Sequence, residues 1–202
     1  MLEYNIIVGI DLGQQTDYTV LSILELIPGS HQNKPLYNLV YVYRVPLKTP
    51  YPLIINWIVW VVETMLSTRS YIVIVDYTGV GRPIVDALRD KEIHLIAANI
   101  TSGSTAHWRY GTEVGIPKIE LVTTLLLVLN TLRLRIPKAT ELLEHLIQEF
   151  VSFKKAPRIN HGSSYEAAQG YHDDIVISIS LAVWYGEFMA KGGNSISISS
   201  EL

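Results

Sequence analysis

Acidic residues stand at three places in the chain where carboxylates can do chemistry. Asp11 and Asp76 each end an apolar, β-branched run, and the pair Asp173–Asp174 opens an aliphatic stretch near the C-terminus. Ligands of open α/β sheets gather beyond the carboxyl ends of parallel strands, where the ends of two such runs can lie side by side. A helix beginning near Asp173 can aim its first carboxylates at the same point. The spacing therefore predicts one cluster of carboxylates.

Such a cluster has a matching chemistry. Close carboxylates repel and desolvate poorly, so a divalent ion is usually needed to neutralise them. Ligands that are all oxygen favour Mg²⁺ or Mn²⁺ over zinc, and phosphodiester hydrolysis uses two such ions about 4 Å apart. Each residue alone has a simpler interpretation, because Asp11 and Asp76 precede glycine-bearing turns and Asp173–Asp174 suits a helix N-cap. Together they favour a metal site.

The apolar runs around these residues predict a mixed β-sheet flanked by helices, with three antiparallel strands followed by parallel ones. Strands are expected over Asn5–Asp11, Tyr18–Leu26, Leu36–Val45, Tyr71–Asp76 and Ile93–Ala98, and helices over residues 50–67, Pro83–Asp90, Pro117–Asn130, Lys138–Phe150 and Gly170–Ala190. Residues 99–116 are expected to form a long polar loop. Val151–Lys154 and the residues near Tyr165 are expected to form a small hairpin.

Length and composition predict one domain. The 202 residues are 49% hydrophobic, enough for a single core, so we expect a domain over residues 1–190 and a flexible C-terminal tail over residues 191–202. The net charge of −3 gives no global basic signature, so nucleic acid would need a local basic patch. The chain has no cysteine, no secretory signal and no apolar run near the roughly 20 residues that cross a bilayer. These features predict a cytoplasmic protein without membrane contact.

Five segments carry the most specific residue patterns: VGIDLGQQTDYTV, IVDYTGVGRPIVDAL, IPKIELVTTLL, LRIP and GYHDDIVISISLAVW. In this order they closely resemble the nuclease domain of phage large terminase subunits, which has an RNase H-like fold. The resemblance extends from Ile6 to about Trp184. It implies a metal-dependent DNA endonuclease that cuts concatemeric viral DNA during genome packaging. It also implies double-stranded DNA, a packaging ATPase, a portal and a small terminase subunit as partners, in the host-cell cytoplasm if the protein is viral.

By position, the resemblance makes Asp11, Asp76 and Asp174 ligands of two Mg²⁺ or Mn²⁺ ions. Asp173 would be a further ligand or would support one. Asp17, six residues after Asp11, matches an acidic position in some members of the family. Capping the start of the second strand is an equally good interpretation of Asp17.

Two alternatives start from the same segments. GIDLG followed by Gln, Thr and a strand also resembles the first phosphate loop of actin-like and sugar-kinase ATPases, but those enzymes close a nucleotide between two copies of this core. The chain also lacks the P-loop pattern of the packaging ATPase, so we expect an excised nuclease domain or a free-standing relative. A DNA-binding module that does not cut is the second alternative. Loss of a ligand would indicate it, and none is lost.

Basic side chains near the predicted site are candidates to contact the DNA backbone, which would give weak sequence preference. The candidates are Arg82, Lys118, Lys154, Lys155 and Arg158. Lys118 follows a proline, as in the terminase pattern, and either touches a phosphate or only begins a helix. The region of residues 131–160, which includes Arg133, has an excess of positive charge, whereas Glu141–Glu149 is expected to be ordinary solvated surface. His172 is expected to be a structural hydrogen-bonding group.

Overall fold

The computed structural model describes residues 4–13, 17–31, 34–79, 81–155 and 173–193. The strands are β1 (Ile6–Asp11), β2 (Val20–His31), β3 (Lys34–Arg44), β4 (Tyr71–Asp76), β5 (Leu95–Thr101), β6 (His107–Arg109), β7 (Glu113–Pro117) and β8 (Leu134–Arg135). The helices are α1 (Tyr51–Met65), α2 (Arg82–Arg89), α3 (Lys118–Asn130), α4 (Leu143–Lys155) and α5 (Asp174–Ala190).

The strands form a mixed sheet in the order β6-β7-β5-β4-β1-β2-β3-β8. β1, β2 and β3 are antiparallel neighbours, and β4, β5 and β7 continue from β1 as parallel strands. The two shortest strands lie at the edges, where β6 pairs antiparallel with β7 and β8 pairs parallel with β3. The predicted sheet, three antiparallel strands followed by parallel ones, is confirmed.

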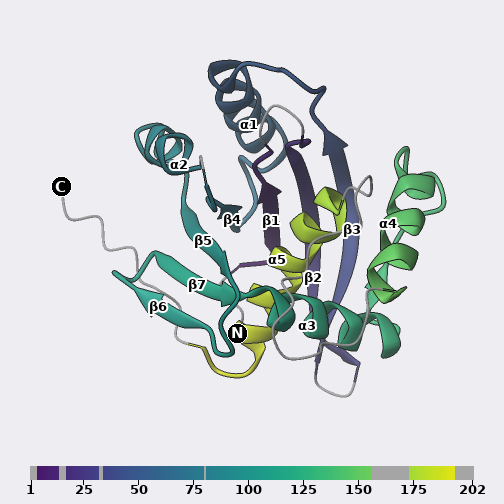
Figure 1. The fold of residues 1–202 in the computed structure, drawn as a ribbon. Coiled ribbons are helices and arrows are strands. Elements are labelled where there is room, and N and C mark those ends of the chain that lie inside the picture. The colour runs from purple at the N-terminus through teal and green to yellow at the C-terminus, as the bar shows by residue number, and fades with distance from the viewer. Residues whose placement is uncertain (1–3, 14–16, 32–33, 80, 156–172, 194–202) are drawn as a thin grey trace.

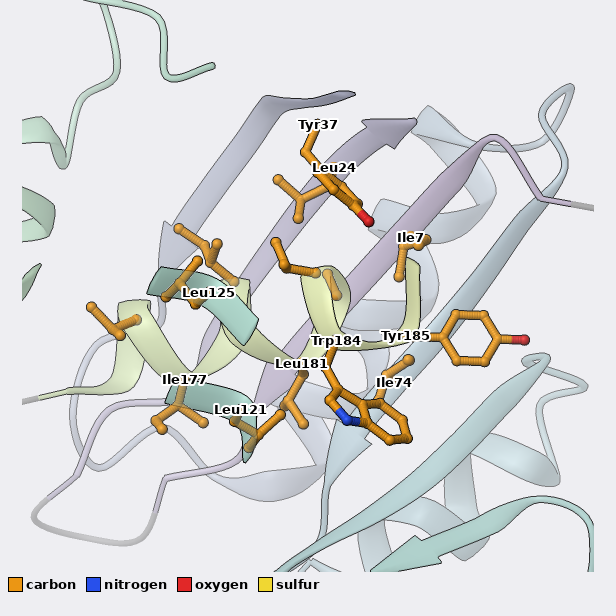
Figure 2. Packing of buried hydrophobic residues seen from close by; sticks show 14 of the residues in the cluster. Ile7, Leu24, Tyr37, Ile74, Leu121, Leu125, Ile177, Leu181, Trp184 and Tyr185 are labelled. Carbon is orange, nitrogen blue, oxygen red and sulfur yellow. The ribbon is translucent and has the colours of Figure 1, made fainter. Parts of the chain in front are cut away.

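Helices cover both faces of this sheet (Figure 1). Alternation along β1 explains the two layers, because Ile7 packs with α3, α4 and α5, whereas Val8 and Ile10 pack with α1 and α2. Figure 2 shows side chains of α5, among them Ile177 and Leu181, beside residues of α3 and of the strands. The core therefore has a helical layer on each side of the sheet.

α5 is the central helix of its layer. All residues from Asp174 to Glu187 are buried, as expected for a helix that is apolar on every side. A Cβ atom at Gly9 of β1 would stand 1.9 Å from the carbonyl oxygen of Ser178, so only glycine lets the α5 backbone lie this close to the strand. This contact brings the start of α5 to the end of β1.

Three sequence predictions about elements were wrong. Residues 99–116 are not one loop, because β5 extends to Thr101 and β6 and β7 form within this segment. Short strands containing Glu, Gly and Pro carry little β-propensity, and neighbours in the sheet decide them. β8 was not predicted at all. The hairpin at Val151–Lys154 was also wrong, because α4 continues to Lys155.

Several other expectations concern residues outside those described. The residues near Tyr165, the helical start at Gly170–His172 and most of the expected tail belong to this group. The domain bounds therefore stay predictions. Within the described ranges, no helix is long and apolar enough to cross a membrane.

Candidate active site

The centre of the site is a pair of aspartates at the ends of neighbouring strands. β1 and β4 are parallel and in register, so the backbone of Asp11 lies directly beside that of Asp76. Both are the last residues of their strands, and Asp76 is only 9% exposed. The sheet therefore fixes two carboxylates side by side, at the carboxyl edge where α/β proteins bind ligands.

The start of α5 brings the second acidic pair to the same place. Asp173 and Asp174 line a cleft of about 350 Å³ together with Asp11, Asp17 and Asp76. Asp174 is 6% exposed and Asp173 is partly exposed. Every acidic residue that the sequence put forward thus lines one cleft, although the metal-binding role of each stays a prediction.

Burial and crowding shift the protonation of this cluster. Burial, followed by the charges of Asp76, Asp174 and Asp173, raises the pKa of Asp11 well above its ordinary value, and Lys118 opposes the rise. Burial also raises the pKa of Asp76, against hydrogen bonds from Thr78 and the charge of Lys118. The cluster is short of positive charge, which is the electrostatic condition that a bound cation relieves.

Thr78 orients Asp76 and was not identified from the sequence. Its backbone N–H and its Oγ1 hydroxyl both donate to Oδ1 of Asp76, over 2.8 and 2.5 Å. The amide of Ile100 on β5 in turn donates to the Thr78 hydroxyl oxygen over 2.8 Å. The signal available in the sequence was the spacing Asp-x-Thr after a strand, which favours a local side-chain turn.

Lys118 lies inside the cleft. It is the first residue of α3, and its Nζ donates to Oδ2 of Asp173 over 2.9 Å. Asp173 occupies the N-cap position of α5 but makes no side-chain cap hydrogen bond. The acidic pair is therefore directed to the cleft, and the simpler N-cap interpretation of Asp173 does not apply.

The other basic candidates lie in different settings. Arg82 forms an ion pair with Glu113, and its guanidinium carbon is 5.3 Å from the centre of the Tyr77 ring. Lys154 and Lys155 belong to the last turn of α4. Arg158 and His172 lie outside the described residues. Of the predicted DNA contacts, the structure brings Lys118 alone to the acidic cleft, as far as the described side chains go.

Asp17 borders two hollows. It lines the acidic cleft, and with Gly13 it also lines an adjoining hollow of about 450 Å³ formed by residues 45–51 and Ile54. A Cβ atom at Gly13 would stand 2.2 Å from the carbonyl oxygen of Asp17, so glycine is needed where the chain folds back. The turn thus brings Asp17 to the edge of the site.

Two residues expected at the solvated or basic surface are buried instead. Glu149 is 6% exposed, forms an ion pair with Arg44, and accepts hydrogen bonds from the first amides of α5. Burial raises the pKa of Glu149 to about 7, against the Val176 amide and Arg44. Arg133 is fully buried and is paired with Glu187. Sequence reasoning missed both because their partners are distant in the chain.

The donor set fits a hard divalent cation. Carboxylate oxygens are the ligands that Mg²⁺ and Mn²⁺ prefer, and four aspartates from β1, β4 and the start of α5 line the cleft. Among the described side chains, no three carboxylate or imidazole groups already stand close enough together to hold an ion. Closing the cluster around a cation would require carboxylates to turn and the pair between Lys118 and Asp173 to adjust.

The comparisons with known proteins agree with this geometry. The chain is 25% identical over 198 residues to the large terminase subunit of Thermus virus P23-45; the match covers 96% of the chain but 34% of that protein. No protein-family model matches the chain.

Solved structures show the fold. The large terminase nuclease of thermophilic phage G20c matches with a TM-score of 0.58 and 20% identity, over 90% of this chain and 82% of that one. The large terminase of another thermophilic bacteriophage gives 0.61 and 16%, over 91% and 40% of the two chains. The human cytomegalovirus terminase nuclease domain gives 0.57 and 8%, over 94% and 87%. The chain therefore has the RNase H-like fold of terminase nuclease domains, and its resemblance to large terminase subunits is confirmed.

Proposed function

We propose that this chain is a metal-dependent DNA endonuclease of the viral terminase type, which cuts concatemeric DNA during genome packaging. The observation that carries the proposal is the in-register pair Asp11–Asp76, completed by Asp173 and Asp174 in one cleft. A terminase-type nuclease acting on phosphodiester bonds is what the similar proteins support. The solved cytomegalovirus nuclease domain was soaked with manganese, which agrees with divalent metal use.

In this mechanism Asp11, Asp76 and Asp174 would hold two Mg²⁺ or Mn²⁺ ions, with Asp173 as a further ligand. When bound, such ions activate water and stabilise the leaving oxygen of a phosphodiester. The protein's own groups prepare the site: Thr78 holds Oδ1 of Asp76 in place, and Lys118 supplies a positive charge beside the acidic group. Double-stranded DNA is the proposed substrate, and a packaging ATPase, a portal and a small terminase subunit are the proposed partners.

Plasmid cleavage in Mn²⁺, Mg²⁺ or EDTA tests this function. Asp76→Asn should lower the cleavage rate more than about 100-fold, beyond the roughly 10- to 100-fold typical of a residue that only supports a ligand. The matched control is Asp90→Asn, which removes the same charge from an exposed residue at the end of α2. Cleavage in EDTA, or equal activity of wild type and Asp76→Asn, would refute the mechanism.

The same preparation separates the rival functions. Stabilisation by a nucleotide without DNA cleavage would favour the ATPase interpretation. Retention of DNA in gel-shift assays without cleavage in any metal would favour a binding module.

A further inference from the structure

The first turn of α5 lacks the cap that a helix usually receives from its own N-terminal residues. The first amides of a helix have no partner within the helix, and an N-cap side chain normally accepts from them. Asp173 occupies that position but makes no side-chain cap hydrogen bond, because its carboxylate pairs with Lys118 in the cleft. Directing the acidic pair to the cleft therefore leaves the amides of α5 to be satisfied from elsewhere.

Glu149 of α4 supplies the missing cap. Its Oε2 accepts from the amides of Ile175 and Val176, over 3.0 and 3.1 Å. These amides directly follow Asp174, so the carboxylate of Glu149 holds the turn that carries the predicted metal ligand. A negative group at this end of a helix is also stabilised by the helix dipole.

Arg44 completes the arrangement from the sheet. It is the last residue of β3, and its guanidinium pairs with Oε1 of Glu149, the oxygen that does not accept from α5. Its guanidinium carbon also lies 4.6 Å from the centre of the Tyr18 ring, which directly follows Asp17. Arg44 and Glu149 thus connect the chain around Asp17 to the start of α5, on two sides of the acidic cleft.

We propose that Glu149 is a positioning residue for the active site, which together with Arg44 holds the start of α5 so that Asp174 faces Asp11 and Asp76. The proposal rests on the proposed function, since it treats Asp174 as a metal ligand. A merely structural role would stabilise α4 against α5 without affecting the metal. The positions of the two accepted amides, immediately after Asp174, favour positioning.

The test compares Glu149→Ala and Glu149→Gln with Tyr37→Phe in the otherwise intact protein. Tyr37→Phe removes a buried hydrogen bond to Glu187 at the other end of α5, so it loosens the same helix away from the cleft. Glu149→Gln keeps an oxygen that can accept from the amides, and it is the variant to use if Glu149→Ala does not fold. The measurements are Mn²⁺ binding by calorimetry, kcat and KM for plasmid cleavage, and hydrogen exchange at the α5 amides.

Glu149→Ala should weaken Mn²⁺ binding and lower kcat by about 10- to 100-fold, as removal of groups that orient metal ligands does. KM for DNA should change less than about threefold, and the amides of Ile175 and Val176 should exchange faster. Glu149→Gln should recover part of the loss, and Tyr37→Phe should leave Mn²⁺ binding unchanged. Unchanged Mn²⁺ binding in a folded Glu149 variant, or an equal loss in Tyr37→Phe, would overturn the proposal.

The failure of the proposed function would look different. A wild-type protein that binds Mn²⁺ but cuts no DNA would refute the nuclease function, while the binding data would still support positioning by Glu149. A wild-type protein that cuts DNA while its Glu149 variants bind Mn²⁺ normally would refute positioning alone. A wild-type protein that binds no Mn²⁺ would overturn both.

Discussion

Neutralising Asp11 should stabilise the metal-free protein while removing its activity. The carboxylate of Asp11 is surrounded by those of Asp76, Asp174 and Asp173 and by the single opposing charge of Lys118, and its pKa is raised by burial and by these carboxylates. Asp11→Asn keeps the size of the side chain and removes its charge. Relief of like-charge repulsion and desolvation should be worth about 1–2 kcal/mol. For a domain of this length, that raises Tm by roughly 2–8 °C.

The effect should depend on pH with a defined sign. Because the folded-state pKa of Asp11 is raised above its ordinary value of 3.8, the protonated form is favoured in the folded protein. The stability linked to this group is therefore complete below pH 3.8 and is lost as the pH rises through the folded-state pKa. The advantage of Asp11→Asn over wild type should thus be greatest near neutral pH and should shrink in acid.

Thermal unfolding followed by circular dichroism, in EDTA and with added Mn²⁺, measures both effects. Mn²⁺ should stabilise wild type according to its concentration relative to its Kd, and should stabilise Asp11→Asn less. Asp90→Asn controls for the change in net charge at an exposed residue. The reasoning is refuted if Asp11→Asn melts below wild type in EDTA at neutral pH, or if Mn²⁺ raises Tm equally in both proteins.

Two further predictions concern the groups around the site. Arg133→Met should destabilise the protein by about 3–5 kcal/mol in chemical denaturation, because it leaves Glu187 buried without its cation, and the double variant with Glu187→Met should recover much of the loss. Thr78→Val removes a hydroxyl that donates to Asp76, so about 1 kcal/mol of carboxylate stabilisation is lost and the ionised fraction falls about fivefold on the acidic side. The acidic limb of the cleavage rate should then move to higher pH, and an unchanged pH profile would contradict this role of Thr78.

The sequence by itself determined the strands that end in Asp11 and Asp76 and the helix that follows Asp173. Unbroken β-branched runs and a long aliphatic run are local patterns, and they specify these elements without information about neighbours. The rule that parallel strands present ligands at their carboxyl ends then placed the acids near one another. The register of β1 against β4 and the cleft lined by both acidic pairs agree with that expectation.

Only the tertiary structure decided the partners of these groups. Lys118 meets Asp173 across 55 positions of sequence, Glu149 meets the α5 amides across 26 and 27, and Arg44 meets Glu149 across 105. A glutamate one turn after the buried Leu146 was the sole local sign that this face of α4 is covered. Burial and ion pairing depend on which surfaces meet after folding. A sequence pattern records the chemistry of one side chain, and packing alone determines whether that side chain faces water, a cation or the unpaired amides of a helix.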